Sequence, residues 1–82
     1  MKFFKLILSE KRGENYYEGI HEKFIKAQNW DTAYNKSLKI AGTFFNHYID
    51  ASPSVVDRDF KFHFNDGYAA IWINSLEKIE VV

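Results

Sequence analysis

Cysteine is absent from this sequence, so neither a disulfide nor a thiolate metal site can support the fold. Proline occurs once, at Pro53, and the four glycines are scattered, which excludes a glycine-rich phosphate loop. An excess of positive charge is also missing, since 11 basic residues balance 11 acidic ones. Proteins that bind nucleic acids or membrane surfaces usually carry a basic excess, so this balance disfavours both classes.

Aromatic residues are abundant instead, with eight Phe, five Tyr and two Trp in 82 residues. A chain of this length is near the lower limit for a hydrophobic core that is stable without disulfides or metal ions. Large aromatic side chains supply the buried apolar area that such a core needs. We expect one domain over residues 1–82. We also expect a cytoplasmic protein without a membrane span, because Lys5 interrupts the apolar start and no small-residue cleavage site follows.

Residues 29–49 have the clearest helical pattern in the chain. Asn29 can cap the first turn through its side-chain oxygen, and Asp31 lies where the helix dipole favours negative charge. Pro53 is expected to end the helix. The apolar side of this helix comprises Trp30, Ala33, Tyr34, Ser37, Leu38, Ile40, Ala41, Phe44, Phe45 and Tyr48.

The first segment, residues 3–8, predicts a strand in which Phe4, Leu6 and Leu8 share one face. Residues 9–15 are polar and predict a turn. Residues 16–28 fit two structures, since Ile20 and Phe24 lie on one side of either a helix or a strand. We favour the strand, because Gly19 weakens a short helix and because a hairpin gives the first strand a partner.

The C-terminal part predicts further strands. Alternation of Phe60, Phe62 and Phe64 indicates one strand, and Asn65-Asp66-Gly67 is a strong hairpin signal. Residues 68–74 form the expected return strand, which is apolar on both faces. Residues 75–76 are expected to turn or bulge the chain, and residues 78–82 predict a short last strand.

These segments predict an α+β fold in two layers, with an antiparallel sheet of four to five strands packed on one long helix. The chain order is strand, strand, helix, strand, strand, with the fifth strand at residues 78–82. Five large side chains are predicted to lie in the core: Trp30, Leu38, Phe45, Phe62 and Ile71.

Candidate reactive residues do not form a recognisable site. The three histidines, His21, His47 and His63, fall on different elements and lack metal-ligand spacing. We expect each to be solvated or hydrogen-bonded at the surface. Residues 57–59, Asp-Arg-Asp, supply too few ligands for a divalent ion and predict a polar strand entry. We therefore expect no catalytic residue, no cofactor, no metal and no enzyme activity.

One helix can cover only one face of a sheet, yet the predicted strands carry large apolar residues on both faces. This surplus predicts a protein-interaction module that contacts a protein partner or a second copy of itself. The interface candidates are Phe3, Ile7, Tyr17, Tyr68 and Trp72. The alternative is binding of single-stranded nucleic acid on an aromatic sheet face edged by Lys2, Lys5 and Lys61, which the neutral charge disfavours.

The small size and the bias toward Lys, Asn, Ile, Phe and Tyr resemble the general run of small phage-encoded or mobile-element proteins. Such proteins often bind and block a larger host protein. The resemblance implies a binder or inhibitor, and no sequence motif carries it.

Overall fold

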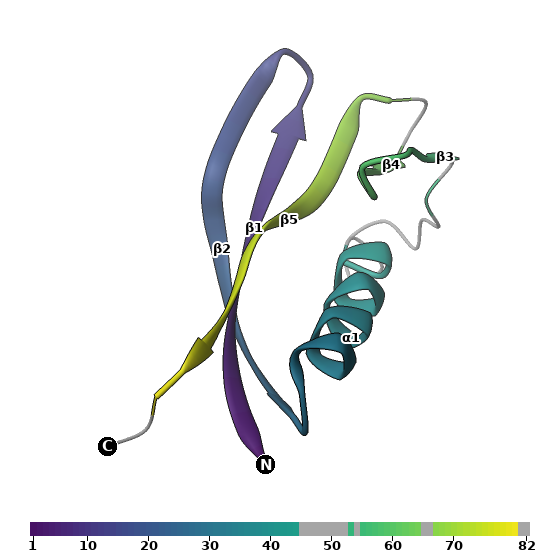
Figure 1. The fold of residues 1–82 in the computed structure, drawn as a ribbon. Helices are drawn as coiled ribbons and strands as arrows, with labels where there is room; N and C mark the ends of the chain where they lie inside the picture. The colour runs from purple at the N-terminus through teal and green to yellow at the C-terminus, as the bar shows by residue number, and fades with distance from the viewer. Residues whose placement is uncertain (45–52, 54, 65–66, 81–82) are drawn as a thin grey trace.

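The fold consists of one helix packed on one antiparallel sheet (Figure 1). The computed structural model describes residues 1–44, 53, 55–64 and 67–80. Its elements in chain order are β1 (Lys2–Arg12), β2 (Asn15–Ala27), α1 (Trp30–Gly42), β3 (Val55–Val56), β4 (Phe62–Phe64) and β5 (Ala69–Ile79). The sheet order is β2-β1-β5-β4-β3. This confirms the predicted two-layer α+β architecture.

Strands β1 and β2 form a long hairpin, which confirms a strand rather than a helix at residues 16–28. The predicted turn at residues 9–15 is too long, because β1 continues to Arg12, which is opposite Asn15. Gly13 has a φ of +59°, a left-handed conformation that glycine adopts without steric cost. The tight turn then allows polar residues at both strand ends to remain paired. Figure 1 shows this hairpin extending well beyond the end of α1.

The core lies between α1 and the sheet. Phe4, Leu6 and Leu8 of β1 all point to this side and are buried, as their alternation predicts. The facing side of α1 carries the small residues Ala33, Ser37 and Ala41, all buried. Small side chains let the helix axis approach the sheet closely, so the large residues of β1 fill the layer between them.

Helix α1 begins as predicted, since the Asn29 side chain accepts a hydrogen bond of 2.8 Å from the Thr32 backbone N–H. It ends at Gly42, well before Pro53, so the predicted extent was wrong over residues 43 and 44, and residues 45–49 lie outside the described part. A Cβ on Gly42 would lie 3.2 Å from the Phe62 ring. The helix therefore ends where its backbone touches β4. No helix among the described residues is long and apolar enough to cross a membrane.

The C-terminal strands differ from the prediction in three ways. Strand β5 runs unbroken to Ile79 with a register shift after Ile73, so residues 78–79 belong to β5 rather than to the separate last strand predicted at residues 78–82, of which residues 81–82 lie outside the described part. Phe60 has a φ of +56° and lies outside β4, which breaks the predicted Phe60–Phe64 alternation. The two-residue β3 was not predicted. Gly67 has the expected positive φ, whereas residues 65–66 lie outside the described part.

Among the predicted core residues, Phe62 and Ile71 are buried, as expected. Leu38 is half-buried and packs against the core, and Phe45 lies outside the described residues. Trp30 was predicted wrongly, because its side chain is 47 % exposed. It stacks on Tyr34, with ring centroids 5.1 Å apart, and donates a 3.0 Å hydrogen bond from Nε1 to the Leu76 carbonyl. Trp30 thus covers the edge of the core from outside.

Candidate protein-interaction surface

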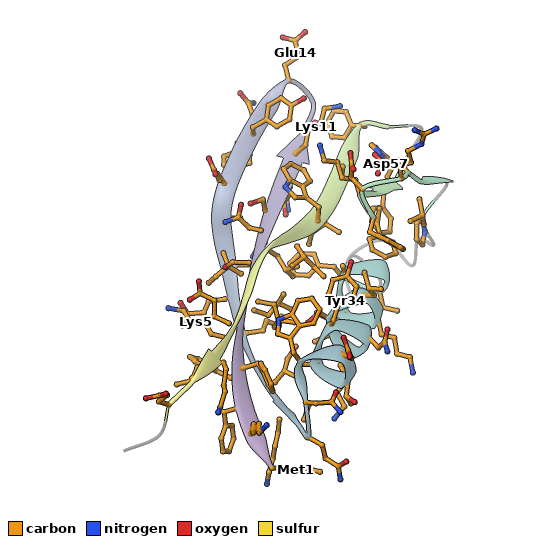
Figure 2. The ribbon with its side chains drawn as sticks, viewed as in Figure 1. Met1, Lys5, Lys11, Glu14, Tyr34 and Asp57 are labelled. Atoms are coloured by element: carbon orange, nitrogen blue, oxygen red, sulfur yellow. The ribbon has the colours of Figure 1, made fainter. Side chains whose placement is uncertain are left out.

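The side of the sheet away from α1 is called the open face here. The strand register places nine residues on it: Phe3, Lys5 and Ile7 of β1, Glu22, Phe24 and Lys26 of β2, and Ser75, Glu77 and Ile79 of β5. Lys5 projects to this side, whereas Tyr34 lies on the helix side (Figure 2). Because successive side chains of a strand alternate, burial of one set against α1 leaves the other set on the open face.

Large apolar side chains are exposed on the open face. Phe24 is 65 % exposed and Phe3 is 41 % exposed, while Ile7 and Ile79 are half-buried beside them. Contiguous exposed aromatic and aliphatic residues are typical of protein contact surfaces. The open face therefore carries four apolar side chains around the central Lys5, and no protein element among the described residues covers it.

The charges on the open face are balanced in sign. Lys5 Nζ lies 3.5 Å from a Glu22 carboxylate oxygen. Lys26 Nζ lies 5.8 Å from the centroid of the Phe3 ring, within range of a cation–π contact. Glu77 is opposite Lys5 in the register. Two lysines thus face two glutamates, so the face attracts neither polyanions nor polycations strongly as a whole.

A second aromatic group lies farther along the sheet, around Trp72 on β5. The Lys61 amine lies 5.0 Å from the Trp72 ring centroid, and the Tyr16 ring meets it edge-on at 6.4 Å. Trp72 is half-buried and faces the same side as Ser9, its neighbour on β1. Because a cation and a second ring flank the indole, little of its face remains open for stacking on a base.

The five interface candidates from the sequence do not form one patch. Phe3, Ile7 and Trp72 share the open face. Tyr17 does not lie with them, because it is opposite Glu10 on the helix side. Tyr68 is exposed next to β5, and a Cβ on Gly13 would lie 3.4 Å from its ring. Phe3 and Ile7 are therefore the two candidates on the regular, exposed part of the face.

Sequence reasoning missed the residues of β2 that contribute most to the surface. Ile20, Glu22, Phe24 and Lys26 alternate with the buried Ile25 and Ala27, and all four are exposed. Had the strand alternation been followed through residues 20–27, it would have placed Phe24 opposite the core. The helical alternative grouped Phe24 with Ala27 and concealed this signal.

A buried carboxylate lies on the helix side of the hairpin. Glu10 is 3 % exposed, and its two oxygens are held by Arg12 Nε at 2.7 Å and His21 Nε2 at 3.0 Å. Beside it, the backbone N–H of Gly19 donates to Ser9 Oγ at 2.8 Å. These bonds fix β2 at the point where its register with β1 shifts. His21 is hydrogen-bonded as expected, and the cluster lies at this register shift.

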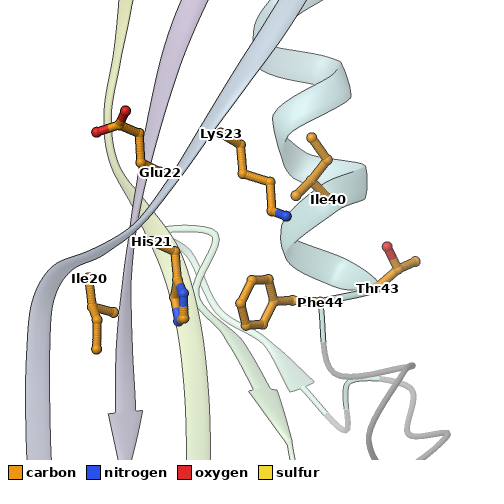
Figure 3. Close-up of a pocket in the computed structure, with 7 residues that line it drawn as sticks. All are labelled: Ile20, His21, Glu22, Lys23, Ile40, Thr43 and Phe44. Atoms are coloured by element: carbon orange, nitrogen blue, oxygen red, sulfur yellow. The ribbon is translucent and has the colours of Figure 1, made fainter.

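An open groove with a volume of about 490 Å³ separates β2 from the C-terminal end of α1 (Figure 3). Its lining residues are Ile20, His21, Glu22, Lys23, Ile40, Thr43 and Phe44. The Phe44 ring packs on the His21 ring, with centroids 4.5 Å apart. Figure 3 shows Thr43 on the far side of Phe44 from His21. This arrangement does not pair the imidazole with the hydroxyl, so it lacks the geometry of an activated nucleophile.

The Asp57–Asp59 segment forms a turn that Asp57 organises. Asp57 Oδ1 accepts from the backbone N–H of Asp59 at 2.9 Å and of Lys61 at 3.1 Å, and Oδ2 is 3.0 Å from His63 Nε2. The hydrogen bond with His63, followed by the one from Lys61, lowers the pKa of Asp57 below its ordinary value. This carboxylate is thus committed to the turn, as a polar strand entry requires. His47 lies outside the described residues.

No group of three or more His, Cys, Asp or Glu residues suited to a metal ion occurs in the described part of the chain. Comparison of the sequence with protein-family models finds no match, and comparisons with curated proteins and with solved structures find none either.

Proposed function

We propose that this chain is a non-catalytic protein-interaction module that binds protein through β2 and the adjoining open face. The observation that carries the proposal is the exposure of Phe24, a residue that is 65 % accessible within the regular part of β2. Strand interiors that display an aromatic ring beside further apolar residues are typical of contact surfaces.

The polar groups favour binding over catalysis. Glu10 and Asp57 are both held by intrachain hydrogen bonds, and each histidine in the described residues has one of these carboxylates as a partner. Binding of single-stranded nucleic acid is disfavoured because Lys26 and Lys61 lie over the rings that would stack on bases. The cytoplasmic location and the phage-type inhibitor role expected from the sequence remain predictions.

The proposal is tested by photo-crosslinking in the cells that make the protein. A photo-reactive phenylalanine analogue replaces Phe24 in one variant and Lys39, exposed on the outer side of α1, in the control. We expect an adduct of defined protein mass from position 24 and none from position 39. An adduct that nuclease removes, or no adduct at position 24, would contradict the proposal.

A further inference from the structure

We propose that β2 pairs antiparallel with β2 of a second copy of this chain, in the register that places Phe24 opposite its own counterpart. This inference rests on the proposed function and names the partner of the same surface. The sheet order leaves β2 as an edge strand of 13 residues, so one side of its backbone has no strand neighbour in the part of the chain that the structure describes. The opposite edge strand, β3, has only two residues.

The register shows which backbone groups point to the free edge. Arg12 and Asn15 close a two-residue turn, so they form a hydrogen-bonded pair, and alternate residues of β1 then point toward β2. On β2, the partners of Leu8, Leu6 and Phe4 are His21, Lys23 and Ile25. Their N–H and C=O groups therefore point toward β1 and form hydrogen bonds with it. The residues between those partners, Glu22, Phe24 and Lys26, direct theirs outward.

A hydrogen bond from α1 independently supports this assignment. Lys36 Nζ donates to the Lys26 carbonyl at 2.8 Å, which agrees with a carbonyl directed away from β1. The bond occupies one lone pair at one end of the free edge. A carbonyl oxygen has two lone pairs, so the Lys26 carbonyl can also accept from an incoming strand.

The length of the regular stretch fixes the centre of the pairing. Gly19, with a φ of +64°, lies in the irregular part of β2, and the uniform register runs from His21 to Ala27. A two-fold axis normal to the sheet pairs the most residues when it passes through the middle of this stretch. That middle residue is Phe24.

The charges agree with the same register. With Phe24 on the axis, Glu22 is opposite Lys26 of the second copy, and the symmetry repeats this pair on the other side. Both ion pairs flank two adjacent Phe24 rings on the open face. Opposite charges and aromatic residues in directly opposed positions stabilise antiparallel strands.

The neighbouring registers are less favourable. An axis through Lys23 sets two lysines directly opposite each other, and an axis through Glu22 does the same with two glutamates. An axis through Ile25 pairs Phe24 with Lys26 and leaves Glu22 opposite Gln28. Only the axis through Phe24 matches every charge on the open side of β2 with an opposite one.

The test is a set of charge exchanges read by sedimentation equilibrium over a dilution series. We expect the wild type to dimerise reversibly. Glu22→Lys and Lys26→Glu should each raise the Kd about tenfold, since each creates two like-charged pairs. An equimolar mixture of these two variants should form a heterodimer with a Kd within about twofold of the wild type, because both opposite-charge pairs are restored. The mixture also controls for folding, since unfolded variants could not recover.

The matched control is Glu77→Lys, which makes the same charge change on the open face away from the free edge. It should leave the Kd within about twofold of the wild type. A wild type that stays monomeric at all concentrations, or a variant mixture that does not recover, would overturn the register. A monomer that still gives a crosslink to a different protein from position 24 would overturn the self-pairing and leave the proposed function standing.

Discussion

The two faces of the sheet are built from the same strands but differ in what covers them. On β1, Leu6 is fully buried beneath α1, whereas Phe3 on the other side is 41 % exposed. The small residues of α1 let that helix pack closely on one face only. The open face keeps residues of comparable size without a covering element among the described residues. Buried packing is thus concentrated on the covered face, and the proposed binding surface on the open one.

This division has consequences that can be measured. Substitutions on the covered face should change the free energy of unfolding, and substitutions on the open face should change association.

The largest loss of stability is expected from Leu6→Ala. Leu6 is fully buried, and removal of its branched side chain leaves a cavity between β1 and α1. We expect the free energy of unfolding to fall by about 2–5 kcal/mol, measured by urea denaturation of dilute protein. A loss smaller than that of any open-face substitution would reverse the comparison between the faces.

Glu10→Ala tests whether the hairpin depends on its buried carboxylate. The substitution leaves Arg12 and His21 without the acceptor that each has in the wild type. We expect a loss of about 1–3 kcal/mol, again from urea denaturation. The control is Glu14→Ala at the exposed hairpin tip, where we expect less than about 0.5 kcal/mol. Equal effects of the two substitutions would show that the cluster does not fix β2.

Trp30→Ala should have a smaller effect than the sequence implied. A core tryptophan would cost about 3–5 kcal/mol, but this ring is half-exposed and makes one hydrogen bond and one stacking contact. We expect about 1–2 kcal/mol, measured by thermal denaturation with fluorescence detection. A loss of about 3–5 kcal/mol in the free energy of unfolding would instead show that Trp30 is part of the core.

Asp57→Asn tests the turn before β4 through pH. The pKa of Asp57 is lowered in the folded state, so its charge stabilises the fold above the ordinary value of 3.8, and this stabilisation is lost as pH falls through the folded value. We expect a modestly lower melting temperature for the variant near neutral pH. The difference should vanish in acid, where both side chains are neutral. A difference that persists in acid would assign the effect to lost packing instead.

Phe24→Ala should affect the isolated fold least. Because the ring is mostly exposed, we expect a change below about 1 kcal/mol in the unfolding of dilute protein. The same variant should associate more weakly than the wild type in sedimentation experiments. A large loss of stability under dilute conditions would show that Phe24 belongs to the fold rather than to the surface.

The sequence predicted the layers well because the signals involved are local. Alternation in residues 3–8 identified the buried set of β1, and Asn29 marked the start of α1. The end of α1 could not be predicted in this way, because its last residue, Gly42, lies close to the Phe62 ring, a proximity between residues far apart in the chain. Trp30 was wrongly assigned to the core because helical periodicity shows which side of the helix a residue lies on. It does not show whether the sheet is wide enough to cover that residue.

The surface was harder to predict than the core for a physical reason. Phe3 and Ile7 were found because an alternating strand has only two sides. Tyr17 does not share their side, because it lies opposite Glu10 on the helix side, an even number of residues from the buried Ile25. The alternation of a strand was not applied to this part of residues 16–28. Phe24 was missed because its spacing from Ile20 fits a helix as well as a strand.

The most direct measurement is amide hydrogen exchange along β2 at low and high protein concentration. We predict that His21, Lys23 and Ile25, which pair with β1, are protected at both concentrations. The amides of Glu22, Phe24 and Lys26 should exchange freely in dilute protein and become protected at high concentration, because pairing with a second copy occupies them. Fast exchange of these three amides at every concentration would contradict self-association through this edge.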